Sequence, residues 1–333
     1  MRVRFDELKA EMKRVLVDHG FSEERAETSA EMFVWNSADG IASHGANRFP
    51  RVVSYLEKGY IDVDAEPVQV KSLGAIEQWD GNLGMGNLNA HFCMDRAIEL
   101  ARQQGIGAVA LRNTNHWMRG GAYGWQAAEA GFAGMCWTNT QPNMPPWGSK
   151  ERKVGNNPVV FAVPRESGSI VVDAAVAQYS YGKIEQAAMA NELLPYPGGF
   201  DAQGNLTSDP VAIQKTWRVL PMGYWKGSGL SIVLDLLAAT LSGGNTVREV
   251  GKLGGDEYGL SQVFIAMDVS RLSDREWANE AINATLTDIK QSEPVDENTE
   301  IRYPGERELR TRADSLAKGV VIDDDVWKAI RSL

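Results

Sequence analysis

The sequence predicts a mixed helix-and-strand protein whose N-terminal segment is entirely helical. Three observations support this fold class. Apolar residues recur at helical spacing over residues 5–58, apolar runs broken by glycine follow Pro67, and further helical patterns lie between those runs. With 43% hydrophobic and 23% charged residues among 333, the composition is that of an ordinary globular protein with one large or two interlocked domains.

Helical patterning dominates the N-terminal segment. Apolar side chains fall on one face of residues 5–18, and Gly20 is a suitable C-terminal stop. Ser22 is a suitable N-cap for a second helix over 22–38, and a third helical stretch covers 51–58. We therefore expect this segment to form a helical unit.

Strands and helices alternate through the rest of the chain. Strands are expected over 68–73, 106–111, 132–138, 159–163, 170–173 and 262–269. Helices are expected over 88–103, 121–130, 184–194, 228–242, 275–289 and 323–333. The polar, turn-rich stretch 198–216 is expected to be a connection, and its length indicates function rather than mere linkage.

Composition excludes several classes of protein. The formal net charge of -10 disfavours nucleic acid and anionic membranes as partners, because both require a basic face. The sequence has no run of eighteen apolar residues and no secretory leader, so we expect a cytoplasmic protein. Cys93 and Cys136 are the only cysteines and form no CxxC, which supports neither a disulfide scaffold nor a metal site.

Standard nucleotide and hydrolase motifs are absent from the sequence. There is no GxGxxG, and its nearest match, 105–110, precedes a predicted strand, whereas a Rossmann fingerprint follows one, so we interpret it as a helix stop. GxxxxGK[ST], HExxH and GxSxG are also missing. Any nucleotide must therefore be held by another arrangement.

Residues 43–50 concentrate reactive groups. Ser43, His44 and Arg48 lie close together in sequence, with Gly45 giving the backbone freedom. Imidazole can deliver a proton to a ketone oxygen near neutral pH, and the planar guanidinium matches a carboxylate. If the segment continues as a helix from His44, Arg48 shares its face. The alternative is that Ser43 caps a helix and that His44 and Arg48 are surface residues, or that Arg48 pairs with an acidic residue across a dimer.

Two other regions are candidate ligand sites. Asn115 and His116 follow a predicted strand and precede a helix, where ligands often bind, although Asn115 is alternatively a helix cap. The glycine-rich stretches 221–229 and 304–307 are typical of backbone cradles. In the first, free amides at a helix N-terminus and Lys226 would attract an anion.

Together these segments resemble the malate/L-lactate/sulfolactate dehydrogenase family of nicotinamide oxidoreductases, which is unrelated to the Rossmann dehydrogenases. The resemblance covers nearly the whole chain. It is carried by 43–45 with Arg48, 113–116 with 120–121, 146–148, 155–158, 221–229 and 304–306.

The resemblance implies an α+β fold. It implies a non-Rossmann NAD-binding domain around a largely antiparallel sheet, covering 71–303, and a small helical domain built from both chain ends, 1–70 and 304–333. It also implies a homodimer with the active site near the subunit interface.

The same resemblance implies roles for particular residues. His44 is the proton donor to the carbonyl. The implied cofactor contacts are Ser169, Ile170, Val171, Val172, Asp173, Ala174, Ala175, Trp225, Lys226, Gly305, Glu306 and Arg307. The resemblance implies NADH as the cofactor. Many family members carry hydroxyl side chains where this chain has 174–177, Ala-Ala-Val-Ala, so this departure leaves NADPH open.

The reaction expected from this set is reduction of a small 2-oxo acid. Ser43 orients His44 or binds the ketone oxygen, Arg48 binds the carboxylate, and His116 with Asn115 lines the other wall. Asp201 is one acidic candidate for orienting His44. The alternatives are a malate, lactate or sulfolactate dehydrogenase, a cyclic-imine-2-carboxylate reductase, or a catalytically silent nicotinamide-binding sensor.

Overall fold

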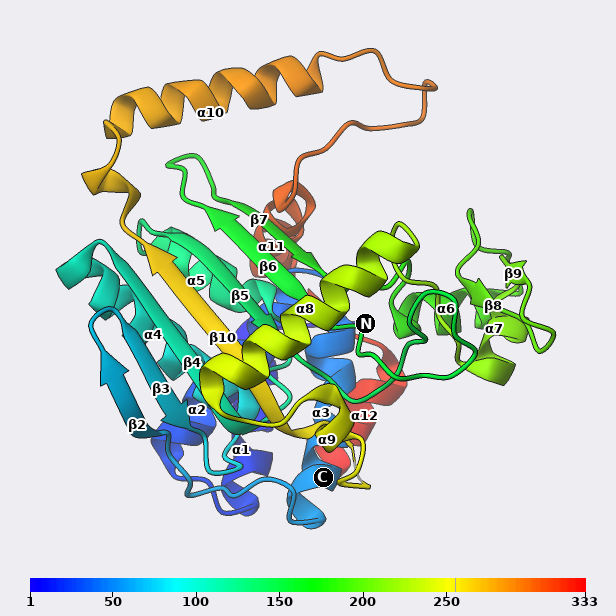
Figure 1. Cartoon of the computed structure of the whole chain (residues 1–333), viewed down its shortest axis with the longest axis horizontal. Helices are drawn as coiled ribbons and strands as arrows, with labels where there is room; N and C mark the ends of the chain where they lie inside the picture. The colour runs from blue at the N-terminus through cyan, green and yellow to red at the C-terminus, as the bar shows by residue number, and fades with distance from the viewer. Residues whose placement is uncertain (255) are drawn as a thin grey trace.

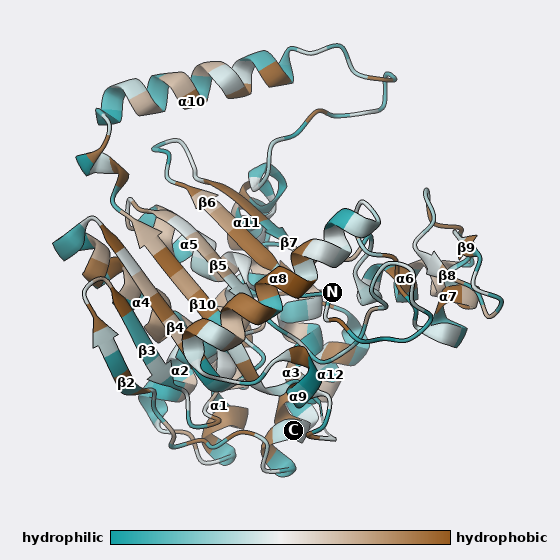
Figure 2. Ribbon diagram, viewed as in Figure 1, coloured by the Kyte–Doolittle hydropathy of each residue, from teal (hydrophilic) through white to brown (hydrophobic). Residues whose placement is uncertain are grey.

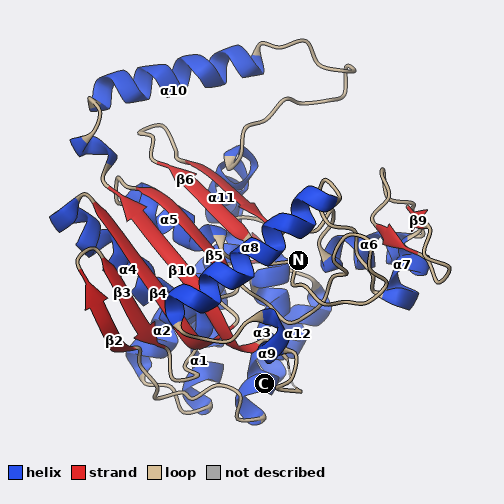
Figure 3. Ribbon diagram, viewed as in Figure 1, coloured by secondary structure: helices blue, strands red, loops and turns tan. Residues whose placement is uncertain are grey.

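The computed structural model describes residues 1–254 and 256–333, which are built around one seven-stranded sheet (Figures 1 and 3). The strand order is β2-β3-β4-β10-β5-β6-β7, and every neighbouring pair is antiparallel except β3 with β4. The strands are β2 (Val68–Leu73), β3 (Ile76–Asp80), β4 (Ile106–Asn115), β10 (Tyr258–Met267), β5 (Ala133–Thr138), β6 (Val159–Val163) and β7 (Ile170–Ala174). The expected largely antiparallel α+β fold without a Rossmann unit is confirmed.

Helices cover both faces of this sheet. On one face lie α4 (Gly86–Gln104) and α5 (Gly121–Glu129), and across the other lies α8 (Trp225–Ser242) (Figure 1). Central strand β10 contributes side chains to the cores on both faces of the sheet. Phe264 packs in the core with α4 and α5, and Val263 packs in the core with α8. This alternation is the period-two pattern of a strand buried on both faces.

The two chain ends pack together in a third core. It joins α1 (Phe5–Asp18), α2 (Glu23–Ala38) and α3 (Phe49–Glu57) to β11 (Val320–Val321) and α12 (Asp324–Ser332). Strand β1 (Arg2–Val3) pairs with β11, and helix α11 (Glu306–Lys318) directly precedes β11 in sequence. The proposed domain boundaries, 1–70 with 304–333 and 71–303, stay a prediction.

A lobe projects from one side of the molecule (Figure 1). It contains α6 (Tyr181–Ala190), β8 (Gly199–Phe200), β9 (Leu206–Thr207) and α7 (Pro210–Thr216). The polar, turn-rich connection expected over 198–216 thus also contains two two-residue strands and one short helix. Asp209 caps α7 through Val211, whose N–H lies 2.8 Å from the carboxylate, and Pro210 suits the first helical position.

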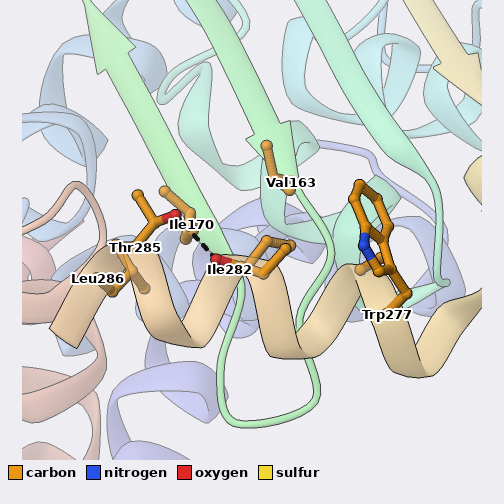
Figure 4. A pocket seen from close by; sticks show the side chains of 8 residues that line it. Val163, Ile170, Trp277, Ile282, Thr285 and Leu286 are labelled. Atoms are coloured by element: carbon orange, nitrogen blue, oxygen red, sulfur yellow. Dashed lines mark hydrogen bonds between the residues drawn. The ribbon is translucent and has the colours of Figure 1, made fainter. Parts of the chain in front are cut away.

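Helix α10 (Arg275–Lys290) runs beside the outer end of β6 and β7 (Figure 1). An apolar groove of about 360 Å³ lies between them, lined by Val163 and Ile170 from the strands and by Trp277, Ile282 and Leu286 from the helix (Figure 4). Among the described residues, none of the helices has the length and apolar character needed to cross a bilayer.

Several predicted elements differ from the observed ones for identifiable reasons. Strand β3 and helix α11 were not predicted, because the inward residues Glu77 on β3 and Glu306 and Ser315 on α11 are polar. Strand β4 extends four residues past the predicted 106–111, to Asn115. Helix α6 ends before the predicted Leu194 because Asn191 adopts a left-handed conformation, φ 55°. Short α9 (Val247–Val250) was not predicted either.

Candidate active site

His44 lies where two short 3₁₀ turns meet. The turns are η1 (Ala42–His44) and η2 (Ala46–Arg48), and Gly45 separates them. A Cβ at Gly45 would lie 2.2 Å from the Ser37 Oγ and 2.8 Å from the Phe33 carbonyl, so glycine is required by the close approach to α2. The interruption means that His44 and Arg48 do not share a continuous helical face, and that part of the expectation is wrong.

The His44 ring is held between a hydroxyl and a second imidazole. Its Nδ1 lies 2.9 Å from the Ser43 Oγ, so Ser43 contacts His44 and does not cap a helix. One face of the His44 ring stacks on the His116 ring, with centroids 5.7 Å apart and planes inclined by 24°. Burial lowers the pKa of His44; the charge of Asp173 opposes this and that of Arg48 adds to it.

Arg48 is paired within its own chain. Its Nη2 donates to the Glu257 carboxylate, and both side chains are largely buried, 14% and 12% exposed. The alternative of an acidic partner across a dimer therefore does not describe this contact. The Arg48 Nε is buried without a hydrogen-bond partner among the described residues.

Glu257 is a site residue that sequence reasoning missed. It lies just before β10, and its backbone carbonyl accepts from the His116 N–H at 3.1 Å. Burial alone would raise the pKa of Glu257, but nearby His116 and Arg48 more than offset this and lower it to about 2. A carboxylate directly before a strand has no motif around it, so only the fold reveals its place.

His116 is largely buried, 12% exposed, and neutral. Burial lowers its pKa to about 3, and its Nδ1 accepts a hydrogen bond of 3.0 Å from the Met118 N–H. The proton therefore resides on Nε2, which lies 3.9 Å from the Glu257 Oε2, beyond hydrogen-bonding distance.

Asn115, which precedes His116, uses its side chain to bind the backbone of another loop. Its amide donates to the Leu83 and Gly84 carbonyls at 2.7 and 2.9 Å, and α5 begins only after Gly120, so the helix-cap alternative is wrong.

The residues assigned to the cofactor form one connected region. After β7, residues 176 and 178 hydrogen-bond to 222 and 220, which lead into α8. At Gly305, which has φ 90°, a Cβ would lie 3.2 Å from both the Val171 nitrogen and the Trp125 ring. The stretches 169–175, 225–226 and 305–307 are thus linked through β7.

Side chains within this region differ in availability. Lys226 and Trp225 are exposed at the start of α8, and Arg307 is exposed on α11. Glu306 is buried and paired with Lys290 and Arg310, but its Oε2 has no hydrogen-bond partner among the described residues.

The backbone amides at the start of α8 are not free. Those of Lys226 and Gly227 donate to the Gly223 and Met222 carbonyls at 3.2 and 2.8 Å, so the expectation of free helix amides there is wrong.

Asp173 and Glu257, not Asp201, are the carboxylates whose charges act most on His44. The Asp201 carboxylate accepts from the backbone amides of Gly204 and Asn205, both at 2.8 Å, within its own turn. Asp173 accepts a 2.7 Å hydrogen bond from the Gly121 N–H, which fixes it against the start of α5. Among the described residues, no group of three or more acidic, histidine or cysteine side chains is arranged to hold a metal ion.

Comparisons with known proteins match the whole chain. The family model described as malate/L-lactate dehydrogenase matches residues 3–331. The chain is 49% identical to the 2,3-diketo-L-gulonate reductase of Escherichia coli K12 over 333 residues, which is the whole of both chains.

Solved structures are also similar. The sulfolactate dehydrogenase of Methanocaldococcus jannaschii has 30% identity and a TM-score of 0.91, with 100% of this chain and 96% of that chain covered. The delta1-piperideine-2-carboxylate reductase of Pseudomonas syringae has 29% identity and a TM-score of 0.87, with 100% and 99% covered.

Proposed function

The chain belongs to the malate/L-lactate dehydrogenase family and is an oxidoreductase, and from this premise we propose that it reduces the carbonyl of a small 2-oxo acid with NADH. The observation that carries the proposal is the grouping of His44, His116 and Arg48 in one partly buried cluster. It offers a proton donor, a neutral hydrogen-bond donor and a guanidinium, which are the groups that a 2-oxo acid requires.

The substrate proposed is 2,3-diketo-L-gulonate. The support is the 49% identity over the full length to reductases of that name, against 30% and 29% to the sulfolactate dehydrogenase and the cyclic-imine reductase. The sequence runs 43–50, 73–80, 115–121, 123–128 and 220–229 also favour this sub-family.

The residues present fit a nicotinamide dinucleotide. Gly305 packs too closely against Val171 and Trp125 to accept a Cβ, and the buried Trp125 Nε1 beside it has no hydrogen-bond partner among the described residues. We assign 169–175, Trp225, Lys226 and 305–307 to holding the cofactor. When bound, the nicotinamide supplies the hydride. NADH is proposed over NADPH from the family resemblance.

His44 supplies the proton. As an imidazolium, it donates from Nδ1 to the Ser43 hydroxyl and presents Nε2–H to the ketone oxygen, so Ser43 fixes which nitrogen faces the substrate. Burial keeps His44 neutral when the site is empty, whereas the negative charge of a bound oxo acid favours the imidazolium. The proton donor is therefore charged most readily when substrate is present.

Arg48 and His116 hold the substrate. The guanidinium fork of Arg48 can keep Glu257 on one nitrogen and bind the substrate carboxylate with another, which an ammonium group cannot do with the same geometry. His116 stays neutral and directs its Nε2–H to a substrate oxygen. In the resting site Glu257 balances the charge of Arg48.

A second copy of the chain is the proposed partner. The middle of α8 is mainly apolar (Figure 2). Its exposed residues are Leu230, Ile232, Val233, Leu236, Leu237 and Leu241. Water-exposed apolar patches of this kind mark interaction sites, and helix α8 begins at the cofactor residues Trp225 and Lys226. A homodimer through α8 would place the interface beside the active site.

The test is a panel of 2-oxo acids assayed with NADH and NADPH separately, following nicotinamide oxidation. The panel contains 2,3-diketo-L-gulonate, oxaloacetate, pyruvate, sulfopyruvate and a cyclic imine carboxylate. We expect the highest kcat/KM with 2,3-diketo-L-gulonate and NADH. Preference for another member would overturn the substrate assignment, and cofactor binding without oxidation by any member would favour the silent sensor.

A further inference from the structure

Asp39 is a buried carboxylate that the reaction described above does not use. It follows the last turn of α2 and is 2% exposed. Its two oxygens accept from Arg312, at 2.7 Å from Nε and 2.9 Å from Nη2, and Oδ2 also accepts from Arg119. One acidic side chain thus binds two guanidinium groups from distant parts of the sequence.

Asp39 and its two arginine partners each lie close in sequence to proposed site residues. Asp39 precedes His44 by five residues, Arg119 follows His116 by three, and Arg312 follows Arg307 by five. The chain after Asp39 is also fixed, since the Asn36 amide donates to the His44 carbonyl at 3.1 Å. A shift of the Asp39 contacts would therefore move the proton donor, its stacking partner and the cofactor segment relative to one another.

Arg312 carries the connection to the cofactor region. Its guanidinium lies 5.3 Å from the Trp35 ring centroid and 5.0 Å from that of Trp125. The Trp125 ring is the surface against which Gly305 packs. Because cation–π contacts fix a ring relative to the cation, the position of Arg312 determines the surface presented to Gly305.

Arg119 carries the connection to the catalytic histidine. A Cβ at Gly121 would lie 3.1 Å from the Asp173 Oδ2 and 3.2 Å from the Arg119 Nε, so Arg119 reaches from Asp39 to the neighbourhood of Asp173. The charges that act on His44 come from every side: Asp173 on β7, Arg48 on η2, Glu257 before β10, and Arg119 before α5, while neutral His116 stacks on the ring.

We propose that Asp39 is a positioning residue, which through Arg119 and Arg312 holds the His44, His116 and Gly305 segments in their working arrangement. This inference rests on the proposed function. A buried ion pair adds little net stability because desolvation opposes the attraction between the charges. Its value here is geometric, since displacement of a reacting group by about 1 Å can cost on the order of a hundredfold in rate.

The test compares Asp39→Asn, Arg119→Gln and the double variant with a matched control, Glu77→Gln. Glu77 is also 2% exposed and also binds a guanidinium with both oxygens, that of Arg96 at 2.7 and 2.8 Å, but it lies on β3 against α4. We expect Asp39→Asn and the double variant to lose at least about tenfold in kcat and to bind NADH more weakly. Glu77→Gln should lose only thermal stability.

The pH profile separates positioning from general damage. Reduction requires protonated His44, so the rate falls as pH rises through the pKa of His44. Removing the Asp39 charge leaves Arg119 uncompensated and should move this alkaline limb to lower pH, whereas Arg119→Gln should move it to higher pH. The double variant removes both charges and should keep the limb near its wild-type position while its turnover stays low.

Wild-type turnover and pH profile in the Asp39 variants, or the same losses in Glu77→Gln, would overturn the inference. If Asp39→Asn fails to fold, the double variant decides, because it removes one charge of each sign from the cluster. Two measurements separate the proposed reaction from the role of Asp39. A wild type that is inactive in the turnover assay would refute the proposed reaction. Unchanged NADH affinity in the variants, measured by fluorescence titration without substrate, would refute the role of Asp39.

Discussion

The imidazole rings of His44 and His116 lie face to face, with centroids 5.7 Å apart, beside the Arg48 guanidinium. Two protonated rings at this distance would repel each other and Arg48. Burial lowers the pKa of His116 to about 3, so His116 remains neutral over the working range, and in the proposed reaction His44 is the ring that carries the proton. The site therefore contains one acid and one fixed hydrogen-bond donor.

His44→Asn should reduce kcat by at least about a hundredfold, because proton transfer by a positioned group contributes about 10²- to 10⁴-fold. NADH affinity should stay close to that of the wild type, since His44 is not among the residues assigned to the cofactor. The measurements are steady-state turnover and NADH fluorescence titration. The matched control is His91→Asn, on α4 beside Asp95. Near-normal turnover in His44→Asn would remove His44 from the mechanism.

Acid should destabilise the fold through His116. The pKa of His116 is lowered from 6.5 to about 3 in the folded chain, so between these pH values the unfolded chain binds a proton that the folded chain does not. The contribution of His116 to the free energy of unfolding therefore falls as the pH decreases through this window, by up to about 1.4 kcal/mol per pH unit. His116→Gln should reduce the slope of unfolding free energy between pH 6 and 5, measured by urea denaturation, relative to His19→Gln. An unchanged slope would contradict a buried neutral His116.

Arg48→Lys should raise the KM for the oxo acid about tenfold or more, with unchanged NADH affinity and unchanged molecular mass. A lysine can pair with Glu257 or with the substrate carboxylate, but it cannot present the planar fork to both. Arg51→Lys is the control. Arg51 pairs with Asp256, the residue that precedes Glu257, and its side chain is 46% exposed. Normal oxo acid binding by Arg48→Lys would leave the substrate carboxylate without an assigned partner.

The sequence predicted most elements that bury apolar residues and failed where polar residues point inward. Residues 5–18 have regular apolar spacing and 159–163 form an unbroken apolar run, and both were predicted with the observed bounds. Strand β3 directs Glu77 inward, where Arg96 neutralises it, and helix α11 buries Glu306 and Ser315. Periodicity rules read hydrophobicity, so elements held by buried ion pairs escape them.

The same limit applies to the site. Ser43, His44 and Arg48 were found because they lie together in sequence, and the structure brings His116 to them. Glu257 and Asp39 were missed because their partners are far away in sequence: Arg48 for the first, Arg119 and Arg312 for the second. Such pairs are created by tertiary structure alone.

A charge on the outer face of α8 should dissociate the proposed dimer. Val233 and Leu236 are 52% and 50% exposed on this face, and a buried unpaired carboxylate opposes association strongly. Leu236→Glu should halve the mass measured by light scattering. Leu272→Glu, at an exposed position beyond η3 (Val269–Arg271), should keep the wild-type mass. A wild-type mass in Leu236→Glu would place the interface elsewhere.

Lys226→Ala should weaken cofactor binding. Lys226 is exposed in the first turn of α8, and the neighbouring backbone amides already donate to the turn carbonyls, so the side chain must supply most of the attraction for a pyrophosphate. A charge-assisted contact at an exposed position should change the cofactor KM by up to about tenfold. The loss should shrink at high ionic strength, because salt screens exposed charges. Lys215→Ala, in the last turn of α7, is the control for a general loss of positive charge. An unchanged cofactor KM with a raised substrate KM would move Lys226 from the cofactor to the substrate side of the site.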